Sequence, residues 1–233
     1  MTRNRLPPVR AVLFDLDGTL LDTADDLASA VNRLRAEEQL PALPVTQLRG
    51  WVSHGGSALV AQGFPGVNGA RFDDLRRRFL EHYRANLHER TQMFADCDQV
   101  LGYIEANRLR WGIVTNKATW LTEPLLQGIG LRDRPGCLVC GDTTAHSKPH
   151  PAPLLHAAGQ LGVDPAQCVY IGDAERDALA ARAAGMRCLI AAYGYYHAGE
   201  NPRSWPADGW LGRPFELIHW LRDAASLDAS SPP

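Results

Sequence analysis

Hydrophobic positions along the chain follow two patterns, short apolar runs and longer stretches with helical spacing. The apolar runs have the length and residue types of buried strands, and they lie at 110–116, 137–140, 168–173 and 187–192. Helices are predicted between them, at 98–107, 118–129, 151–161 and 175–184. Strands that alternate with helices indicate a parallel sheet covered on both faces. We therefore predict an α/β fold with a Rossmann-like, doubly wound parallel sheet as its core.

A long helical segment interrupts this core after its first strand. Residues 11–15 resemble the other predicted strands, but apolar positions then recur at helical spacing over 24–39 and 71–89, with a further helix starting near Ser53. Thr23 is the predicted N-cap of the first helix. We expect a core domain formed by 1–21 and 96–225 and a strand-free, all-helical cap domain at 22–95 inserted into it. Residues 226–233 lack an apolar pattern and are expected to form a flexible tail.

The charge and hydropathy of the chain exclude two classes of partner. A formal net charge of −2 is not typical of a nucleic-acid-binding protein, and no stretch approaches the ~20 apolar residues that cross a bilayer. The basic N-terminal residues lead into a strand and an acidic pair, not into the apolar core of a signal peptide. We expect a cytoplasmic protein, a monomer or a homodimer, that binds neither nucleic acid nor membrane.

Cysteine, histidine and lysine usage narrows the chemistry further. The five cysteines are an odd number without disulfide-framework spacing, and the pair Cys137 and Cys140 lacks the second ligand pair of a zinc site, so we expect buried thiols. The eight histidines show no metal-ligand spacing. Of the 24 basic side chains only Lys117 and Lys148 are lysines, which carry a compact charge where arginine carries a wide, flat one.

Polar side chains gather where the predicted strands end, and ligands of open parallel sheets bind at that edge. Asp15 and Asp17 follow the first strand and lie on the same side of it, so these two like charges need a positive partner. Oxygen ligands from Asp15 and Asp173 suit Mg²⁺, and an ammonium nearby suits a phosphate group. The polar residues at these strand ends are Asp15, Asp17, Thr115, Asn116, Lys148, Asp173 and Asp177.

The segments DLDGT, IVTN, SKPHP and GDAERD resemble, in this order, the four motifs of the haloacid dehalogenase superfamily, and the resemblance covers the whole chain. It implies an enzyme that uses Mg²⁺ and cleaves a small-molecule phosphate ester. Asp15 would be the nucleophile and Asp17 the general acid and base. Mg²⁺ would be held by Asp15, by the backbone carbonyl of Asp17 and by Asp173. Thr115 and Lys148 would complete the catalytic set.

The resemblance also assigns supporting positions. Gly18 and Asn116 would help to bind the phosphate group, and Asp177 would be the second acid of the fourth motif, orienting water or the lysine. Lys117 is expected to be structural or peripheral. Simpler interpretations stay open: Thr115 and Asn116 could cap the following helix, and Asp177 could pair with an arginine on a solvated helix face.

Single positions separate the members of this superfamily. Asp17 argues against a dehalogenase, which needs no proton for its leaving group, and the absence of lysine from the cap argues against a phosphonoacetaldehyde hydrolase. A phosphatase is the favoured interpretation. A sugar phosphate mutase of the β-phosphoglucomutase type stays open, as does a non-catalytic phospho-aspartate signalling or binding module. The large insertion after the first strand and the acid at Asp17 count against the module.

Two further segments indicate the substrate. The cap segment VSHGGSALV resembles the substrate-facing loop of phosphoglycolate-phosphatase-like enzymes, which implies anion binding by Ser53, His54, Gly55 and Gly56. Arg49 is a candidate to clamp a carboxylate. The run AAYGYYHAGENPRSWPADGWL resembles a branch that includes N-acetylmuramic acid 6-phosphate phosphatases of cell-wall recycling. The resemblance implies a small phosphate that carries a carboxylate, either N-acetylmuramic acid 6-phosphate or 2-phosphoglycolate.

Overall fold

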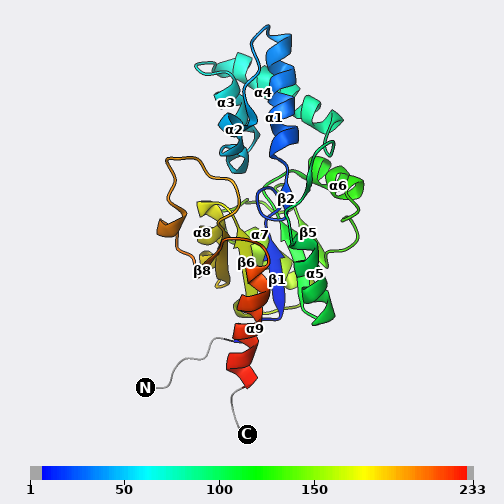
Figure 1. Cartoon of the computed structure of the whole chain (residues 1–233), viewed down its shortest axis with the longest axis vertical. Coiled ribbons are helices and arrows are strands. Elements are labelled where there is room, and N and C mark those ends of the chain that lie inside the picture. The colour runs from blue at the N-terminus through cyan, green and yellow to red at the C-terminus, as the bar shows by residue number, and fades with distance from the viewer. Residues whose placement is uncertain (1–6, 230–233) are drawn as a thin grey trace.

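The structure is a computed structural model that describes residues 7–229. Its centre is a six-stranded sheet in the order β5-β4-β1-β6-β7-β8, in which every neighbouring pair is parallel (Figure 1). The predicted α/β, Rossmann-like fold is therefore confirmed. The strands are β1 (Ala11–Phe14), β4 (Arg110–Val114), β5 (Cys137–Val139), β6 (Cys168–Gly172), β7 (Arg187–Ala191) and β8 (Gly209–Leu211).

Helices cover both faces of this sheet. Val12 and Phe14 belong to a core cluster shared with α5, α6 and α9, whereas Ala11 and Leu13 belong to a second cluster with α7 and α8. Successive residues of β1 thus face opposite layers of helices. Because both faces of the strand are buried, all of its residues are apolar and no polar residues alternate with them. The core helices are α5 (Cys97–Ala106), α6 (Thr119–Gly128), α7 (Ala152–Leu161), α8 (Glu175–Ala183) and α9 (Glu216–Ala229), with short turns η2 (Pro165–Gln167) and η3 (Pro202–Ser204).

The cap lies at one end of the molecule, beyond the sheet (Figure 1). Its two long helices pack through their apolar stripes, since Leu27 and Val31 of α1 and Leu75, Phe79 and Tyr83 of α4 are all buried in one cluster. The cap elements are α1 (Ala24–Glu37), α2 (Val45–Arg49), η1 (Val52–His54), α3 (Gly56–Gly63) and α4 (Gly69–Ala85).

Two short strands join the cap to the core, which corrects the expectation of a strand-free insertion. β2 (Leu21–Asp22) pairs antiparallel with β3 (Gln92–Met93), where the chain enters and leaves the cap. Strands of two residues are too short to show a period, so the sequence pattern could not predict them. The ladder holds the two connections side by side.

Three further details concern expectations from the sequence. Thr23 stands at the N-cap of α1 but makes no capping hydrogen bond, because its hydroxyl donates to Asp17. α9 continues through 226–229, which corrects the predicted start of the tail, since adding residues to an existing helix costs far less than nucleating one. Residues 230–233 lie outside the described residues. The five cysteines are free and buried, as predicted.

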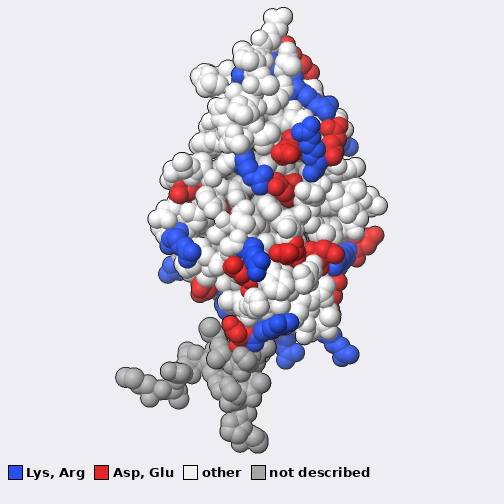
Figure 2. All heavy atoms as spheres, viewed as in Figure 1, with Lys and Arg blue, Asp and Glu red and all other residues white. Residues whose placement is uncertain are grey.

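Acidic and basic side chains are interspersed on the face shown in Figure 2, and most of the clusters there contain both signs. The described residues on this face form no broad basic stripe of the kind that binds nucleic acid. Among the described residues, no helix is both long and apolar enough to cross a bilayer.

Candidate active site

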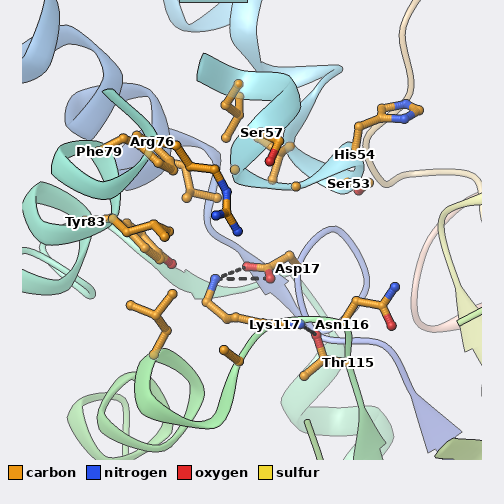
Figure 3. A pocket seen from close by; sticks show the side chains of 18 of the residues that line it. Asp17, Ser53, His54, Ser57, Arg76, Phe79, Tyr83, Thr115, Asn116 and Lys117 are labelled. Atoms are coloured by element: carbon orange, nitrogen blue, oxygen red, sulfur yellow. Dashed lines mark hydrogen bonds and ion pairs between the residues drawn. The ribbon is translucent and has the colours of Figure 1, made fainter. Parts of the chain in front are cut away.

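A cavity of about 380 Å³ lies between the carboxyl edge of the sheet and the cap (Figure 3). Residues that follow β1 and β4 form its core side, and residues of α3, α4 and η1 form its cap side. Gly18, Lys148, Asp173 and Asp177 are outside this lining and make the contacts described below. The predicted site residues that line it are Asp15, Asp17, Thr115, Asn116, Ser53, His54, Gly55 and Gly56.

A buried ammonium joins two carboxylates beside the first strand. Lys148 Nζ lies 3.0 Å from Asp15 Oδ1 and 2.8 Å from Asp177 Oδ1, and the lysine side chain is 0% exposed. It also donates to the carbonyl of Val114 at 2.9 Å and to the hydroxyl of Tyr170 at 2.7 Å. These acceptors satisfy a charge that is otherwise very costly to bury. A guanidinium is wider than an ammonium, which accounts for a lysine here in an arginine-rich chain.

The two carboxylates on Lys148 differ in their electrostatics. Burial raises the pKa of Asp15. The charge of Lys148 acts to lower it, and the charge of Asp177 acts to raise it further. Burial acts in the same direction on Asp177, but the charges of Lys148 and Arg176 outweigh it and lower the pKa of Asp177. Asp177 is 0% exposed, so it holds the lysine and does not lie on a solvated helix face.

Asp173 lies beside these groups and has an oxygen without a partner. Its Oδ2 accepts hydrogen bonds from Ser53 Oγ at 2.6 Å and from Tyr195 N at 2.8 Å. Its Oδ1 is buried and has no hydrogen-bond partner among the described residues. Burial, reinforced by the charges of Asp15 and Asp177, raises the pKa of Asp173 well above its ordinary value. A cation at this point would relieve both the repulsion and the missing contact.

The donor set identifies which carboxylates are available to a cation. Oxygens of Asp15, Asp173 and Asp177 lie within 4.8 Å of one another. Asp177 is already engaged, because one of its oxygens contacts Lys148 and the other accepts the Ala174 N–H at 3.0 Å. Asp15 and Asp173 are left as the pair that fits a divalent cation with hard oxygen ligands.

Gly18 makes the approach of Asp173 possible. Its φ is +82°, a backbone conformation that residues with a side chain rarely adopt. A Cβ at this position would also lie 2.0 Å from Asp173 Oδ2. The turn after β1 therefore needs glycine for two independent reasons, backbone conformation and space.

Asp17 is held by a lysine and a threonine. Lys117 Nζ lies 2.9 Å from Asp17 Oδ1 and 3.1 Å from Oδ2, and Thr23 Oγ1 donates to Oδ1 at 2.6 Å (Figure 3). The ammonium also lies 4.5 Å from the centre of the Tyr83 ring. Burial lowers the pKa of Lys117, but the charge of Asp17 and the contact with Tyr83 outweigh it and raise the pKa above its ordinary value.

Lys117 was expected to be structural or peripheral, and the peripheral alternative is wrong, because the residue lines the cavity and contacts Asp17. Its partner is 100 positions away in the chain, so spacing could not reveal the pair. The available signal was its place directly after a strand end, beside Thr115 and Asn116.

Thr115 and Asn116 organise the loops at the end of β4. Thr115 lines the cavity, and its Oγ1 accepts the N–H of Lys117 at 3.1 Å. The Asn116 amide brackets the backbone of Lys148, donating to its carbonyl at 2.9 Å and accepting its N–H at 3.0 Å. Neither side chain caps α6, because Asp142 accepts the N–H of Thr119 there at 2.9 Å. Asn116 thus fixes the loop that carries the buried lysine.

The cap loop reaches the cavity through its backbone more than its side chains. Ser53 Oγ is used by Asp173, and the ring of His54 points away from the cavity in Figure 3, toward Glu200, which it meets at 3.3 Å. Gly55 has a φ of +84° and precedes α3, whose first residue, Gly56, lines the cavity. A Cβ at Gly56 would lie 3.0 Å from the Phe79 ring, so α3 packs closely on α4.

His54 belongs to a group that sequence spacing did not reveal. His54, His197 and Glu200 bring potential ligand atoms within 4.8 Å, which corrects the expectation of no metal-type arrangement among the histidines. The Gly199 N–H donates to Nδ1 of His197. In a neutral ring the N–H is therefore at Nε2, the nitrogen nearer to Glu200. Trp51 stacks on His197 with ring centres 4.3 Å apart. We interpret this group as a contact between cap and core.

Arg49 does not line the cavity, contrary to its suggested role as a carboxylate clamp. Its guanidinium makes two hydrogen bonds to Asp22, at 3.0 and 2.8 Å, and lies over the Tyr195 ring. Two arginines that the motifs did not single out, Arg76 and Arg176, line the cavity instead. Nη2 of Arg176 lies 4.0 Å from Asp15 Oδ2.

This geometry agrees with the match to known families, since residues 12–191 match the family model described as haloacid dehalogenase-like hydrolase. The chain belongs to the haloacid dehalogenase-like hydrolase family. The predicted family is thereby confirmed, and the relatives below, all named phosphatases, confirm the predicted enzyme class.

Two relatives differ in their names. A phosphoglycolate phosphatase of Xanthomonas campestris is 45% identical over 89% of this chain and 94% of that protein. An N-acetylmuramic acid 6-phosphate phosphatase of Pseudomonas aeruginosa is 40% identical over 98% of this chain and 100% of that protein. Among solved structures, a predicted phosphoglycolate phosphatase from Haemophilus somnus superposes with a TM-score of 0.81 at 24% identity, covering 91% of this chain and 97% of that chain, which supports the fold.

The apolar wall of the cavity in this hydrolase was also not predicted. It comes from both domains, and its members belong to helical stripes that the sequence pattern assigns equally well to a buried core. The wall consists of Leu27, Val52, Leu59, Phe79, Leu80, Tyr83, Trp120 and Leu121.

Proposed function

We propose that this hydrolase cleaves a phosphomonoester in two steps through an aspartyl-phosphate on Asp15, with Mg²⁺ as its cofactor. The observation that carries the proposal is the position of Asp15, which lines the cavity and contacts Lys148, a lysine that Asp177 holds in place. Asp17 lies on the same cavity two residues further on. A nucleophile for the phosphorus atom and a proton donor for the leaving oxygen thus lie on the same cavity.

In the first step, a carboxylate oxygen of Asp15 attacks phosphorus and the bond from phosphorus to the ester oxygen breaks. The leaving oxygen takes a proton from Asp17, which is held in the cavity by Lys117 and Thr23. Asp15 Oδ1 contacts Lys148 and the N–H of Leu16, whereas Oδ2 has, among the described residues, only the contact with Arg176 at 4.0 Å. We assign the attack to Oδ2 because it is the less engaged oxygen.

In the second step, water attacks phosphorus and the acyl phosphate bond breaks, which returns Asp15 as a carboxylate and releases phosphate. Asp17, now deprotonated, takes the proton of the water and is ready for another turnover. Thr115 and Lys148 are proposed to position the phosphoryl group and to offset the charge at Asp15.

Mg²⁺ is proposed as the cation because Asp15 and Asp173 offer few, hard carboxylate ligands. The backbone carbonyl of Asp17 is the proposed third protein ligand. When bound, the ion supplies charge stabilisation for phosphoryl transfer. The unpartnered Oδ1 of Asp173 supports this assignment.

Of the substrates in its relatives' names, we propose N-acetylmuramic acid 6-phosphate. The cavity of about 380 Å³ lies within the ~300–1,000 Å³ range of sites for larger ligands, whereas the two carbons of 2-phosphoglycolate would occupy only part of it. The apolar wall suits the faces and acetyl group of a sugar. The cytoplasmic location and the oligomeric state, monomer or homodimer, stay predictions from the sequence.

The test is phosphate release from N-acetylmuramic acid 6-phosphate and from 2-phosphoglycolate, each with Mg²⁺ and with EDTA. We expect kcat/KM to favour the sugar acid by 100-fold or more, about 2.7 kcal/mol of differential transition-state binding. We expect EDTA to abolish release. A preference for 2-phosphoglycolate would contradict the proposed substrate. A phosphorylated isomer in place of free phosphate would identify a mutase, and the absence of phosphate release from either compound would favour a mutase or another sugar phosphate as substrate.

A further inference from the structure

Among the cap arginines that the structure describes, Arg76 is the one that lines the cavity. This residue of α4 makes no hydrogen bond or ion pair within the described part of the chain. Its neighbour Arg77 pairs with Asp74 and Glu81 on the exposed side of the helix. The other cap arginines that contact a carboxylate, a carbonyl or an aromatic ring are Arg33, Arg35, Arg49, Arg71, Arg78 and Arg84.

The guanidinium of Arg76 is directed into the cavity. Figure 3 shows its side chain extending from α4 toward the region of Asp17 and Lys117. The ammonium groups of the core already have carboxylate partners, Lys117 with Asp17 and Lys148 with Asp15. Arg76 therefore brings an uncompensated positive charge to the cap side of the cavity.

The surroundings of Arg76 favour an anionic ligand. Apolar side chains make up much of the wall, including Leu80 and Phe79 on the same helix and Trp120 on α6. When a ligand excludes water from such a cavity, an unpaired guanidinium is costly to desolvate unless the ligand supplies an anion. A planar carboxylate matches one guanidinium with two parallel hydrogen bonds.

We propose that Arg76 is a specificity-determining residue that binds the carboxylate of the substrate while the phosphate group lies at Asp15. This inference rests on the proposed function, because it assigns the two ends of a phosphorylated sugar acid to the two sides of the cavity. Arg49 cannot take this role, since Asp22 occupies it outside the cavity.

The test compares two substrates that differ in the lactyl ether, the group that carries the carboxylate. N-acetylglucosamine 6-phosphate lacks the lactyl ether of N-acetylmuramic acid 6-phosphate and is otherwise the same sugar phosphate. In the Arg76→Met protein we expect kcat/KM for the muramic acid compound to fall about 10- to 100-fold, mainly through KM, since a charged hydrogen bond is lost. We expect little change for the glucosamine compound. Arg77→Met, on the same helix, is the matched control and is expected to behave as wild type on both.

Calorimetric binding to the Asp15→Asn protein separates this inference from the proposed function. We expect that protein to bind the muramic acid compound more tightly than the glucosamine compound, and the difference to disappear when Arg76→Met is added. Binding of this kind without turnover by the wild type would contradict the proposed function and still support the role of Arg76. Equal loss on both substrates, no loss on either, or no preference in the wild type would overturn the role of Arg76.

Discussion

At the scale of single residues, the site depends on two lysines, whose ammonium groups fit positions that are too crowded for a guanidinium. Lys148 fits four acceptors around one nitrogen with no exposure to solvent. Lys117 contacts both oxygens of Asp17. Both lysines of the chain are therefore in the site. Compact point charges occupy places where a planar guanidinium would displace its neighbours.

Gly18→Ala is expected to damage both folding and the metal site. The methyl group would overlap Asp173 Oδ2 and strain a φ of +82°. Gly66 is the matched control, since its φ is also +82° but nothing lies within 4 Å of a Cβ there. We expect Gly18→Ala to be less stable than Gly66→Ala by about 1–3 kcal/mol, the usual cost of overpacking, and to lose phosphatase activity. Denaturant unfolding and phosphate release check this, and equal behaviour of the two variants would contradict it.

At the scale of elements, the connection between cap and core is tied by one polar network. Asp22 of β2 accepts hydrogen bonds from Arg49 of α2 and, at 2.5 Å, from the hydroxyl of Tyr195. The same hydroxyl accepts the N–H of Thr23 at 2.8 Å, at the start of α1. Tyr195 also donates its backbone N–H to Asp173. The network thus joins the connection of the cap to Asp173, the proposed metal ligand.

Asp22→Asn should weaken this connection in a pH-dependent way. Burial acts to raise the pKa of Asp22, but hydrogen bonds from Arg49 and Tyr195 outweigh it and lower the pKa below the ordinary value of 3.8. The contribution of the carboxylate to stability is then fully present above the unfolded pKa and is lost as the pH falls through the folded pKa. We expect the variant to be about 1 kcal/mol less stable at pH 7, since both side chains are partly exposed, and the difference to vanish in acid. A constant difference from pH 7 to pH 2 would contradict this reading.

Element prediction succeeded where the apolar period was long enough to read. The predicted helices 151–161 and 175–184 agree with α7 and α8 to within a residue at each end. The strands β2 and β3 have two residues each and were missed, because so short a run has no period. β8 was also missed, although β5, which is equally short, was predicted.

Site prediction followed the same physical limit. Residues directly after a strand, such as Asp15 and Thr115, could be predicted, because the carboxyl ends of parallel strands lie at one edge of the sheet whatever the conformation of the loops. The partner of each charge could not be found in this way. From the sequence, Arg49 was singled out and Arg76 was not. Only the folded chain shows that Arg49 is paired with Asp22 and that Arg76 lines the cavity.

At the scale of the whole molecule, two domains share one cavity and one cluster of acidic groups. Ser53 of the cap contacts Asp173 and His54 of the cap contacts Glu200, while the core supplies the carboxylates that we propose to react. An inserted domain that contacts the site directly is suited to admit substrate and exclude water, as lids do in other enzymes.

Mg²⁺ should stabilise the folded protein through Asp173. A ligand that binds only the native state adds about 2.7 kcal/mol of stability at 100 times its Kd, so we expect Mg²⁺ to raise Tm. In Asp173→Asn the shift should disappear. Without metal the variant should be at least as stable as wild type, because it removes a buried charge repelled by Asp15 and Asp177. Thermal melts with Mg²⁺ and with EDTA test this; an undiminished shift in the variant would place the ion elsewhere.

The most direct measurement of the central claim is to trap the phosphoryl group. The enzyme would be quenched in acid during turnover of N-acetylmuramic acid 6-phosphate with Mg²⁺, and its peptides mapped by mass spectrometry. We predict a phosphoryl group on the peptide that contains Asp15. We also predict neither the adduct nor phosphate release in Asp15→Asn, with folding retained. Phosphate release at the wild-type rate by Asp15→Asn, or a phosphoryl group on another residue, would contradict the account.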